Sequence, residues 1–286
     1  MISDITLGQF FPGSSILHRL DPRTKLLLSL LYIIGVFLLN TPMAFILYTL
    51  ITLSLILASR ISMRVILKGI KPIVIVLIFT MIINILLTSG EGEPLFSFLI
   101  FAVYKEGIIR AFFMAYRVIM LIVGSSVLLT YTTSPIALTD GLESLLSPLK
   151  LIKVPVHLFA MMMTIALRFI PTLIEETETI MNAQKSRGAN FTEGSIIKRA
   201  RALIPILVPL FVSSFKRAEE LAVAMECRCY RGDVGRTKMN KLKYRLRDIL
   251  WLTVGALLFA GLILLSVKSA ELSALGEAMR ILFYKI

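Results

Sequence analysis

The chain has 286 residues, of which 57% are hydrophobic and only 17% are charged, and its mean hydropathy is +0.84. This composition is too apolar for an ordinary soluble domain and predicts an integral membrane protein. The formal net charge of +13 fits the cytoplasmic side of such a protein, where lysine and arginine accumulate. A nucleic-acid partner is therefore not needed to explain the charge.

Few residues could form a metal or catalytic centre. The two cysteines, Cys227 and Cys229, are separated by one residue and lack the further donors that a zinc site requires. His18 and His157 are far apart in sequence and are expected at membrane interfaces. No glycine is followed directly by lysine, as the Walker A loop of nucleotide-binding proteins demands. We therefore expect no catalytic residue, no metal and no cofactor bound directly by this chain.

The N-terminal part predicts a cytoplasmic segment, residues 1–25, followed by a hairpin of two membrane spans. The basic residues that close the segment are followed by a long apolar hairpin and not by a small-residue cleavage site, which argues against a signal peptide. The two spans are predicted at residues 26–39 and 43–58, and both are somewhat short for a crossing. Asn40-Thr41-Pro42 between them has turn chemistry.

The third and fourth spans are predicted at residues 73–87 and 107–131. A basic loop with no acidic residue precedes the third span and is expected in the cytoplasm; its cations are Arg60, Arg64, Lys68 and Lys71. An acidic turn at residues 89–94 fits the outside. The apolar residues 95–103 are too few to cross a bilayer, so an interfacial or re-entrant piece is expected there.

Two arginines, Arg110 and Arg117, lie within the fourth predicted span. A charge inside a span is a candidate for function. A long arginine can also turn into a helix bundle or reach the interface for purely structural reasons. The structural interpretation is favoured, and the functional one stays open.

A long basic segment, residues 132–247, separates the fourth span from the last one. The last span is predicted at residues 249–267, with Trp251 near its start at the membrane interface. The positive charge indicates that this segment is cytoplasmic. Five crossings from a cytoplasmic N-terminus would place the C-terminus outside. The fold class is thus all-α, with about five transmembrane helices and a cytoplasmic helical domain; the predicted limits are 1–25, 26–131, 132–247 and 248–286.

Within the basic segment, helical periodicity predicts a short helix at residues 139–149 and two long ones at residues 156–187 and 195–230. Prolines inside the long helices should bend them. Small residues at four-residue spacing in the second long helix would let the two helices cross at close range. The residues assigned to bending and crossing are Pro171, Pro205, Pro209, Ser214, Ala218 and Ala222.

Both long helices end in a similar phrase, with an alanine four residues before an arginine and a glycine soon after it. The first end contains Ser186-Arg187-Gly188 and the second Cys227-Arg228-Cys229, with Gly232 beyond. Either arginine alone could simply favour the last turn of a helix, and Gly188 and Gly232 could be ordinary stops. The repetition favours a pair of docking points, because the planar guanidinium pairs with carboxylates and helix-end carbonyls.

Other classes of function remain as alternatives. An integral membrane enzyme would need acids, bases or metal ligands near the bilayer, and the predicted spans outside the fourth contain none. A stand-alone carrier would be expected to line several spans with polar residues, and few occur. The bases just before the last span favour contact with anionic lipid headgroups; they are Lys238, Lys241, Lys243, Arg245 and Arg247.

The sequence resembles the transmembrane T component of energy-coupling factor (ECF) transporters, importers related to ABC transporters, over nearly its whole length. The phrases that carry the resemblance include Leu20-Asp21-Pro22-Arg23-Thr24-Lys25, Thr132-Thr133-Ser134-Pro135, Leu167-Arg168-Phe169-Ile170-Pro171, Gln184-Lys185-Ser186-Arg187-Gly188 and Ala224-Met225-Glu226-Cys227-Arg228-Cys229-Tyr230. The second arginine motif departs from the family's common Ala-Arg-Gly wording at both flanks.

The resemblance implies a coupling role without catalysis. The two x-Arg-x motifs, Ser186-Arg187-Gly188 and Cys227-Arg228-Cys229, would insert into two cytoplasmic ABC-type ATPase subunits, which hold ATP and magnesium. The scaffold would also grip a separate substrate-binding membrane subunit, the S component, for uptake of a vitamin or a transition-metal ion. The location implied is the cytoplasmic membrane of a prokaryote, and the solute is chosen by the other subunit.

Overall fold

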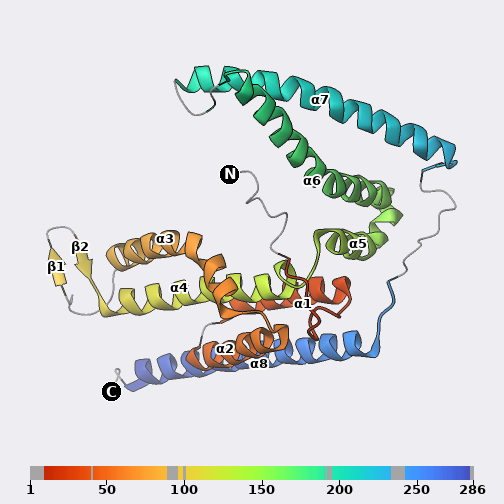
Figure 1. Ribbon diagram of the computed structural model, residues 1–286. Coiled ribbons are helices and arrows are strands. Elements are labelled where there is room, and N and C mark those ends of the chain that lie inside the picture. The colour runs from red at the N-terminus through yellow and green to blue at the C-terminus, as the bar shows by residue number, and fades with distance from the viewer. Residues whose placement is uncertain are drawn as a thin grey trace. The chain divides into compact units, whose positions relative to one another are not determined.

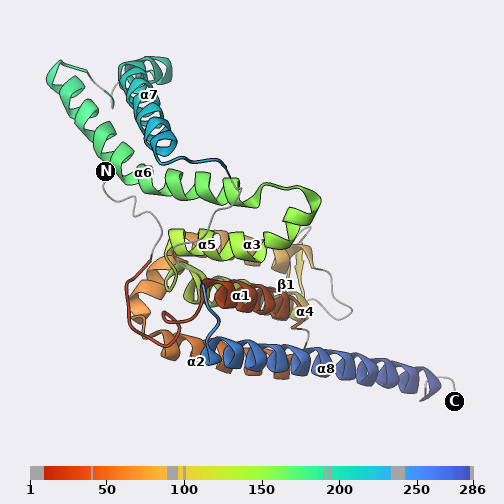
Figure 2. The ribbon, with the colours of Figure 1, turned by 90° about the vertical axis from the view of Figure 1, so that its right-hand side faces the viewer.

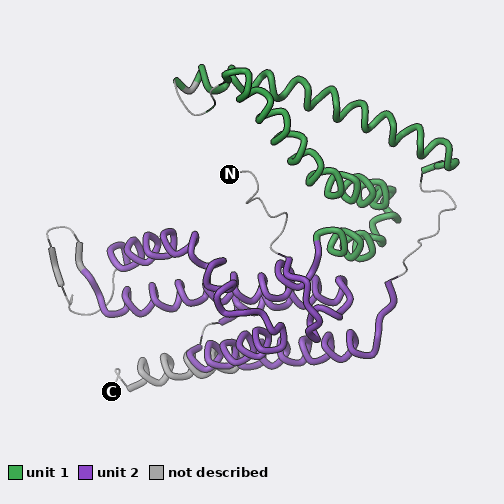
Figure 3. Tube along the Cα trace, in the orientation of Figure 1, with its two compact units in different colours: residues 1–8, 135–241 green, residues 9–134, 242–286 purple. Residues whose placement is uncertain are grey.

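The computed structural model describes residues 10–39, 41–88, 96–98, 101–189, 191, 195–232 and 242–283. The chain divides into two compact units, coloured separately in Figure 3. Unit 2 comprises Gln9–Ser134 and Leu242–Ile286, and unit 1 comprises Met1–Gly8 and Pro135–Lys241. The membrane side of each predicted segment stays a prediction.

Unit 2 consists mainly of five α-helices, labelled in Figure 1. A π-helical turn, η1, continues α4, and a short antiparallel hairpin, β1 with β2, precedes it. The bounds are α1 Pro22–Phe37, α2 Pro42–Ser59, α3 Met63–Leu87, β1 Phe96–Phe98, β2 Phe101–Val103, α4 Lys105–Ser125, η1 Ser126–Thr130 and α8 Leu246–Phe283. Among the described residues the fold is otherwise helical, so the predicted all-α class is confirmed.

The first two helices begin where local chemistry favours a start. Asp21 caps α1, because its side chain accepts a hydrogen bond from the backbone N–H of Arg23 at 3.0 Å. Thr41 caps α2 in the same way, accepting from Ala44 at 3.4 Å. Each cap is followed by a proline in the first turn, where proline is preorganised for a helix and its missing N–H costs nothing. The predicted turn residue Asn40 lies outside the described residues.

The cation-rich stretch before the third span is helical and not a loop, which corrects the prediction. Helix α3 starts at Met63 and continues through Pro72, so Arg64 and Lys68 lie in its first turns. The stretch between Met63 and Lys71 is compatible with a helix, which tolerates Gly69 at a small cost, and a proline within an otherwise apolar helix bends it without ending it. The apolar stretch after the acidic turn forms the β1–β2 hairpin, with Phe98 opposite Phe101.

The core of unit 2 is organised around Tyr32 of α1. Its hydroxyl pairs with Thr52 of α2 at 2.7 Å and donates to the Met120 carbonyl of α4 at 3.1 Å. The Tyr48 hydroxyl donates to the Tyr32 carbonyl at 2.6 Å. A Cβ on Gly124 would overlap the Tyr32 ring, so glycine at this position admits the ring against α4. These contacts join three helices by polar groups that have no water to bond inside a bilayer.

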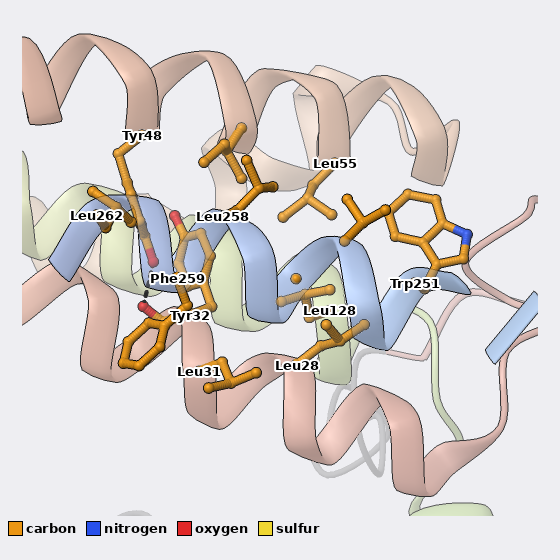
Figure 4. A pocket seen from close by; sticks show the side chains of 13 residues that line it. Leu28, Leu31, Tyr32, Tyr48, Leu55, Leu128, Trp251, Leu258, Phe259 and Leu262 are labelled. Carbon is orange, nitrogen blue, oxygen red and sulfur yellow. Dashed lines mark hydrogen bonds between the residues drawn. The ribbon is translucent and has the colours of Figure 1, made fainter. Parts of the chain in front are cut away.

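Helix α8 lies along α1 and touches α2 (Figures 1 and 2). Between them is a cavity of about 80 Å³, seen from close by in Figure 4. Leu28 of α1, Leu55 of α2, Leu128 of η1 and Leu258 of α8 all line it. Trp251 lies at the end of the cavity nearest the start of α8 (Figure 4).

Arg117 has a structural contact that fits the favoured interpretation. Its guanidinium donates to the Leu39 carbonyl, just past the end of α1, and lies 5.7 Å from the centre of the Phe45 ring. The charge therefore satisfies a helix-end carbonyl and packs on an aromatic face. Arg110 has an exposed side chain, and its role stays open.

Unit 1 contains three α-helices and one 3₁₀ turn among its described residues. The bounds are α5 Pro135–Leu145, η2 Ser147–Ile152, α6 Val156–Ser186 and α7 Ile196–Cys227. The short helix predicted at residues 139–149 is thus α5, which starts earlier and ends at Leu145. Pro148 fits this end, because it has no N–H to donate to the carbonyl four residues earlier, and the chain continues as the 3₁₀ turn η2. His157 of α6 bonds Glu143 of α5 at 2.9 Å and holds these two helices together.

Five helices in the described part of the chain are long and apolar enough to cross a membrane: α2, α3, α4 with η1, α6, and α8 up to Leu265. The number matches the prediction, but one member differs. Helix α1 has only 16 residues, because its run is cut by the turn before Pro42. Helix α6, predicted to be cytoplasmic, qualifies instead because its N-terminal half is apolar and its charges lie mostly towards its C-terminal end.

Candidate functional site

Helix α6 ends in a Schellman motif, a hydrogen-bonded turn that closes the carbonyl end of a helix. The Ala189 N–H donates to the Gln184 carbonyl at 3.0 Å, and the Gly188 N–H donates to the Lys185 carbonyl at 2.9 Å. Gly188 has a φ of 86°, which is the left-handed conformation that this motif requires. Arg187 occupies the last position before that glycine, with φ −88° and ψ 8°.

Helix α7 ends with the same hydrogen bonds. The Tyr230 N–H donates to the Met225 carbonyl at 3.0 Å, and the Cys229 N–H donates to the Glu226 carbonyl at 2.8 Å. Arg228 has φ −90° and ψ 13°, matching Arg187, and Cys229 has a φ of 56°. The helix therefore stops at Cys227, earlier than the predicted stop at Gly232, because Cys229 takes the left-handed position itself.

The two ends therefore present their arginines in the same way. The residues of both x-Arg-x motifs are exposed: Ser186, Arg187, Gly188, Cys227, Arg228 and Cys229. Arg187 precedes α7 and Arg228 follows it, and a straight helix of 32 residues extends over about 48 Å at 1.5 Å per residue. Two equivalent, exposed and widely separated cations suit two separate binding partners better than one shared site.

The matching turns predict opposite effects for two substitutions. Gly188→Ala should weaken the end of α6 by about 1–2 kcal/mol, because a Cβ disfavours the left-handed conformation, while Cys229→Gly should strengthen the end of α7 by about 1 kcal/mol. Hydrogen exchange of the Ala189 amide should become faster in Gly188→Ala. Hydrogen exchange of the Tyr230 amide should become slower in Cys229→Gly. Equal exchange in wild type and both variants would contradict the assignment.

The predicted crossing residues lie on the face of α7 that meets α6. Ser214, Ala218 and Ala222 line a groove of about 250 Å³, which the apolar side chains of Ile165 and Phe169 line from the α6 side. The small residues thus line an open groove between the two helices, and the close crossing stays a prediction. Their short side chains cannot fill the space between two helix backbones, and this explains the groove.

An ion pair joins the two long helices beside this groove. Arg217 Nη2 of α7 lies 2.6 Å from Glu176 Oε2 of α6, and both side chains are partly buried. Helical periodicity places Glu176 on a polar flank of the first long helix but does not pair it with a partner. Opposite charges on two adjacent helices could have suggested such a contact, but the sequence does not reveal the register between the helices.

The predicted bending residues all lie inside continuous helices. Pro171 is within α6, and Pro205 and Pro209 are within α7. Figure 2 shows that α6 bends part-way along its length, as expected for a helix that lacks one backbone hydrogen bond. Neither helix is interrupted at its prolines.

The five long apolar helices of the described part of the chain are typical of a multi-pass integral membrane protein. The chain matches the family described as cobalt transport protein, CbiQ, over residues 13–239. It is 54% identical over 250 residues to the energy-coupling factor transporter transmembrane protein EcfT of Clostridium kluyveri, which covers 87% of this chain and 92% of that protein. Identity to the protein of the same description from Bacillus subtilis is 47% over 263 residues, with 91% and 98% covered.

The chain therefore belongs to the CbiQ family, and it is a transmembrane component of an energy-coupling factor transporter. The family that the sequence resembles is thereby confirmed. Transport by a complex of several components fits a non-catalytic role for this chain.

Proposed function

We propose that this chain is the coupling scaffold of the transporter. Its two arginine-tipped helices, α6 and α7, dock on two cytoplasmic ABC-type ATPase subunits, and its membrane helices hold a separate substrate-binding S component. ATP-driven closing and opening of the ATPase pair moves the two helix ends. The movement passes along the helices into the bilayer and drives uptake of a vitamin or a transition-metal ion.

The observation that carries this proposal is the matching geometry of the two helix ends. Arg187 and Arg228 have nearly the same backbone angles, follow the same pattern of hydrogen bonds and are both exposed. A single arginine at a helix end is common. Two copies of the same capped end, one before α7 and one after it, fit the two equivalent subunits of an ATPase pair.

The contact between α6 and α7 supports the transmission of movement. The Arg217–Glu176 pair joins the two helices beside the groove that they share. An ion pair that is partly removed from water is stronger than an exposed one. The ion pair thus links the helices beside the groove, and the groove leaves room for their relative movement.

Partners and cofactors follow from this role. ATP and magnesium belong to the partner ATPases, which are either two copies of one subunit or two different subunits, and this chain binds neither. The S component selects the solute, so the family description as a cobalt transport protein does not fix the cargo of this chain. Nucleic acid is not among the proposed partners.

The proposed location is the cytoplasmic membrane of a prokaryote, with the N-terminus and unit 1 on the cytoplasmic side and the C-terminus outside. The distribution of cations supports this orientation. Arg64 and Lys68 lie in the first turns of α3, and residues 135–241 carry many more cations. The positive-inside rule assigns such stretches to the cytoplasm.

A pull-down tests the proposal directly. Tagged wild-type protein and the double variant Arg187→Ala with Arg228→Ala are purified from their own membranes in mild detergent, and bound proteins are identified by mass spectrometry. We expect two ABC-type ATPase subunits with the wild type, strong depletion of both with the variant, and an S component with each. If the wild type brings down no ATPase, the coupling function is refuted, and a membrane enzyme or stand-alone carrier becomes the better hypothesis.

A further inference from the structure

Lys25, at the start of α1, is a charged side chain that is almost fully buried, with only 2% exposed. Its ammonium group donates to the Thr132 carbonyl at 2.8 Å and to the Thr133 hydroxyl at 3.2 Å. Both threonines closely follow η1. The ammonium therefore neutralises the carbonyl end of the α4–η1 helix, where backbone acceptors lack partners and the helix dipole is negative.

Asp248 forms the second part of this site and is also 2% exposed. One carboxylate oxygen accepts from the Asp21 N–H at 2.8 Å, and the other accepts from the Arg245 N–H at 2.8 Å. Arg245 is the residue immediately before α8, and Asp248 is the third residue of that helix. The Asp248 carboxylate therefore caps the start of its own helix. Because Asp21 caps α1, Asp248 joins the beginnings of α1 and α8 through a single carboxylate.

Lys25 is the one cation of this cluster and lies near two carboxylates, those of Asp21 and Asp248. Burial lowers the pKa of Lys25 from its ordinary value of 10.5 to about 8, while the nearby carboxylates of Asp21 and Asp248 oppose the shift. At neutral pH the ammonium is therefore still charged and faces two carboxylates. A buried, charged group of this kind rarely adds to stability over an apolar replacement, so its presence calls for another role, such as fixing one geometry.

The position of the cluster along the chain suggests that role. The chain leaves unit 2 at Ser134, directly after Thr133, and returns to it at Leu242, shortly before Asp248. The return stretch has one further contact, since the Arg23 guanidinium lies 5.4 Å from the centre of the Tyr244 ring. The two connections to unit 1 that pass through Ser134 and Leu242 are thus attached to one group of buried charges inside unit 2.

We propose that Asp21, Lys25, Thr132, Thr133 and Asp248 form an anchor cluster, with Lys25 as its positioning residue, through which movement of α6 and α7 reaches the membrane helices. The inference rests on the proposed coupling function. The cluster fixes both connecting segments to the starts of α1 and α8 and to the end of η1. Movement arriving by either connection is therefore applied to three helices together and is not absorbed by loose segments.

The test compares the wild type with the charge-neutral double variant Lys25→Met with Asp248→Asn, each as the complex with its ATPases. Removing the Lys25 and Asp248 charges together keeps the net charge of the cluster and avoids leaving the Asp248 carboxylate buried without its cation, which would be strongly destabilising. Hydrogen exchange is measured with and without ATP. In the wild type we expect ATP to alter exchange in α6, in α7 and at the starts of α1 and α8. In the variant the response of α6 and α7 should persist, and that of α1 and α8 should fall at least twofold.

A milder variant covers the case in which the double variant does not fold. Thr133→Val removes one acceptor of the Lys25 ammonium and keeps every charge, and it should reduce the α1 and α8 response partially. Thr253→Val is the matched control, because this exposed hydroxyl on α8 donates to the Leu250 carbonyl of its own helix, and it should respond as the wild type does. A wild-type response of α1 and α8 in a folded cluster variant would overturn the anchor.

These results separate the anchor from the coupling function. If no ATPase accompanies the wild type, or if ATP leaves α6 and α7 unchanged, the coupling function itself has failed. If α6 and α7 respond and the membrane helices of the cluster variants respond as in the wild type, only the anchor has failed. A purely structural role predicts that a folded variant transmits normally.

Discussion

Reversing both helix-end charges, with Arg187→Glu and Arg228→Glu, is expected to abolish ATPase docking and, with it, transport. Both side chains are exposed, so the substitutions should leave the fold intact. Truncating one partner of a desolvated charge pair at an interface costs about 2–5 kcal/mol. Two such losses, with repulsion added, correspond to a drop in affinity of more than about a thousandfold.

The measurement is the amount of ATPase retained by the tagged complex and the ATP-dependent uptake of the solute that the co-purifying S component binds. The matched control is Lys198→Glu with Arg199→Glu, at the start of α7. Both of these residues are exposed, and the net charge changes by the same amount. We expect the control to retain its ATPases, and each single reversal to retain an intermediate amount. Equal loss in the control would mean that overall charge, and not the helix ends, governs docking.

Replacing Gly124 by alanine is expected to destabilise unit 2 strongly. A Cβ at this position would overlap the ring of Tyr32. That ring cannot simply move, because it is 6% exposed and its hydroxyl is bonded to Thr52 and Met120. Overpacking costs about 1–3 kcal/mol, and each lost hydrogen bond adds about 1 kcal/mol, for a total of about 3–5 kcal/mol.

The readout is the melting temperature of the purified protein in detergent, together with its yield from membranes. Gly261→Ala provides the matched control, since Gly261 also lies in a helix but its new methyl group would meet no described atom within 4 Å. There alanine should be neutral or should stabilise the helix by up to about 1 kcal/mol. A melting temperature for Gly124→Ala equal to that of the wild type would show that the ring packs elsewhere.

The two helix ends can be predicted from sequence because helix termination is mostly a local matter. The similar phrases ending in Arg187 and Arg228 are visible in the sequence, and Gly188 indicates a left-handed stop on its own. The stop predicted at Gly232 is too late, because Cys229 already takes the left-handed conformation. A cysteine in that conformation is unusual, so its residue type gives no signal of the turn.

The contacts that link helices cannot be predicted in the same way. In the sequence Lys25 is one of several cations at the end of a cytoplasmic segment, whereas in the structure it is buried against Thr132. The pattern around Arg117 allows two roles, and its contact with the Leu39 carbonyl fits the structural one. In both cases the partners are distant in sequence, and their meeting depends on how the helices pack.

The membrane class, most helices, the family resemblance and the repeated arginine motif can be read from the residues alone, because composition, periodicity and capping act over a few residues. The folded chain adds which helices adjoin, the shared hydrogen-bonded geometry of the two motifs, and the contacts by which Lys25 and Asp248 join three helix ends. The physical reason is that apolar surfaces fix only which faces are buried. The pairing of individual polar groups is decided when those faces come together and every buried donor and acceptor must find a partner.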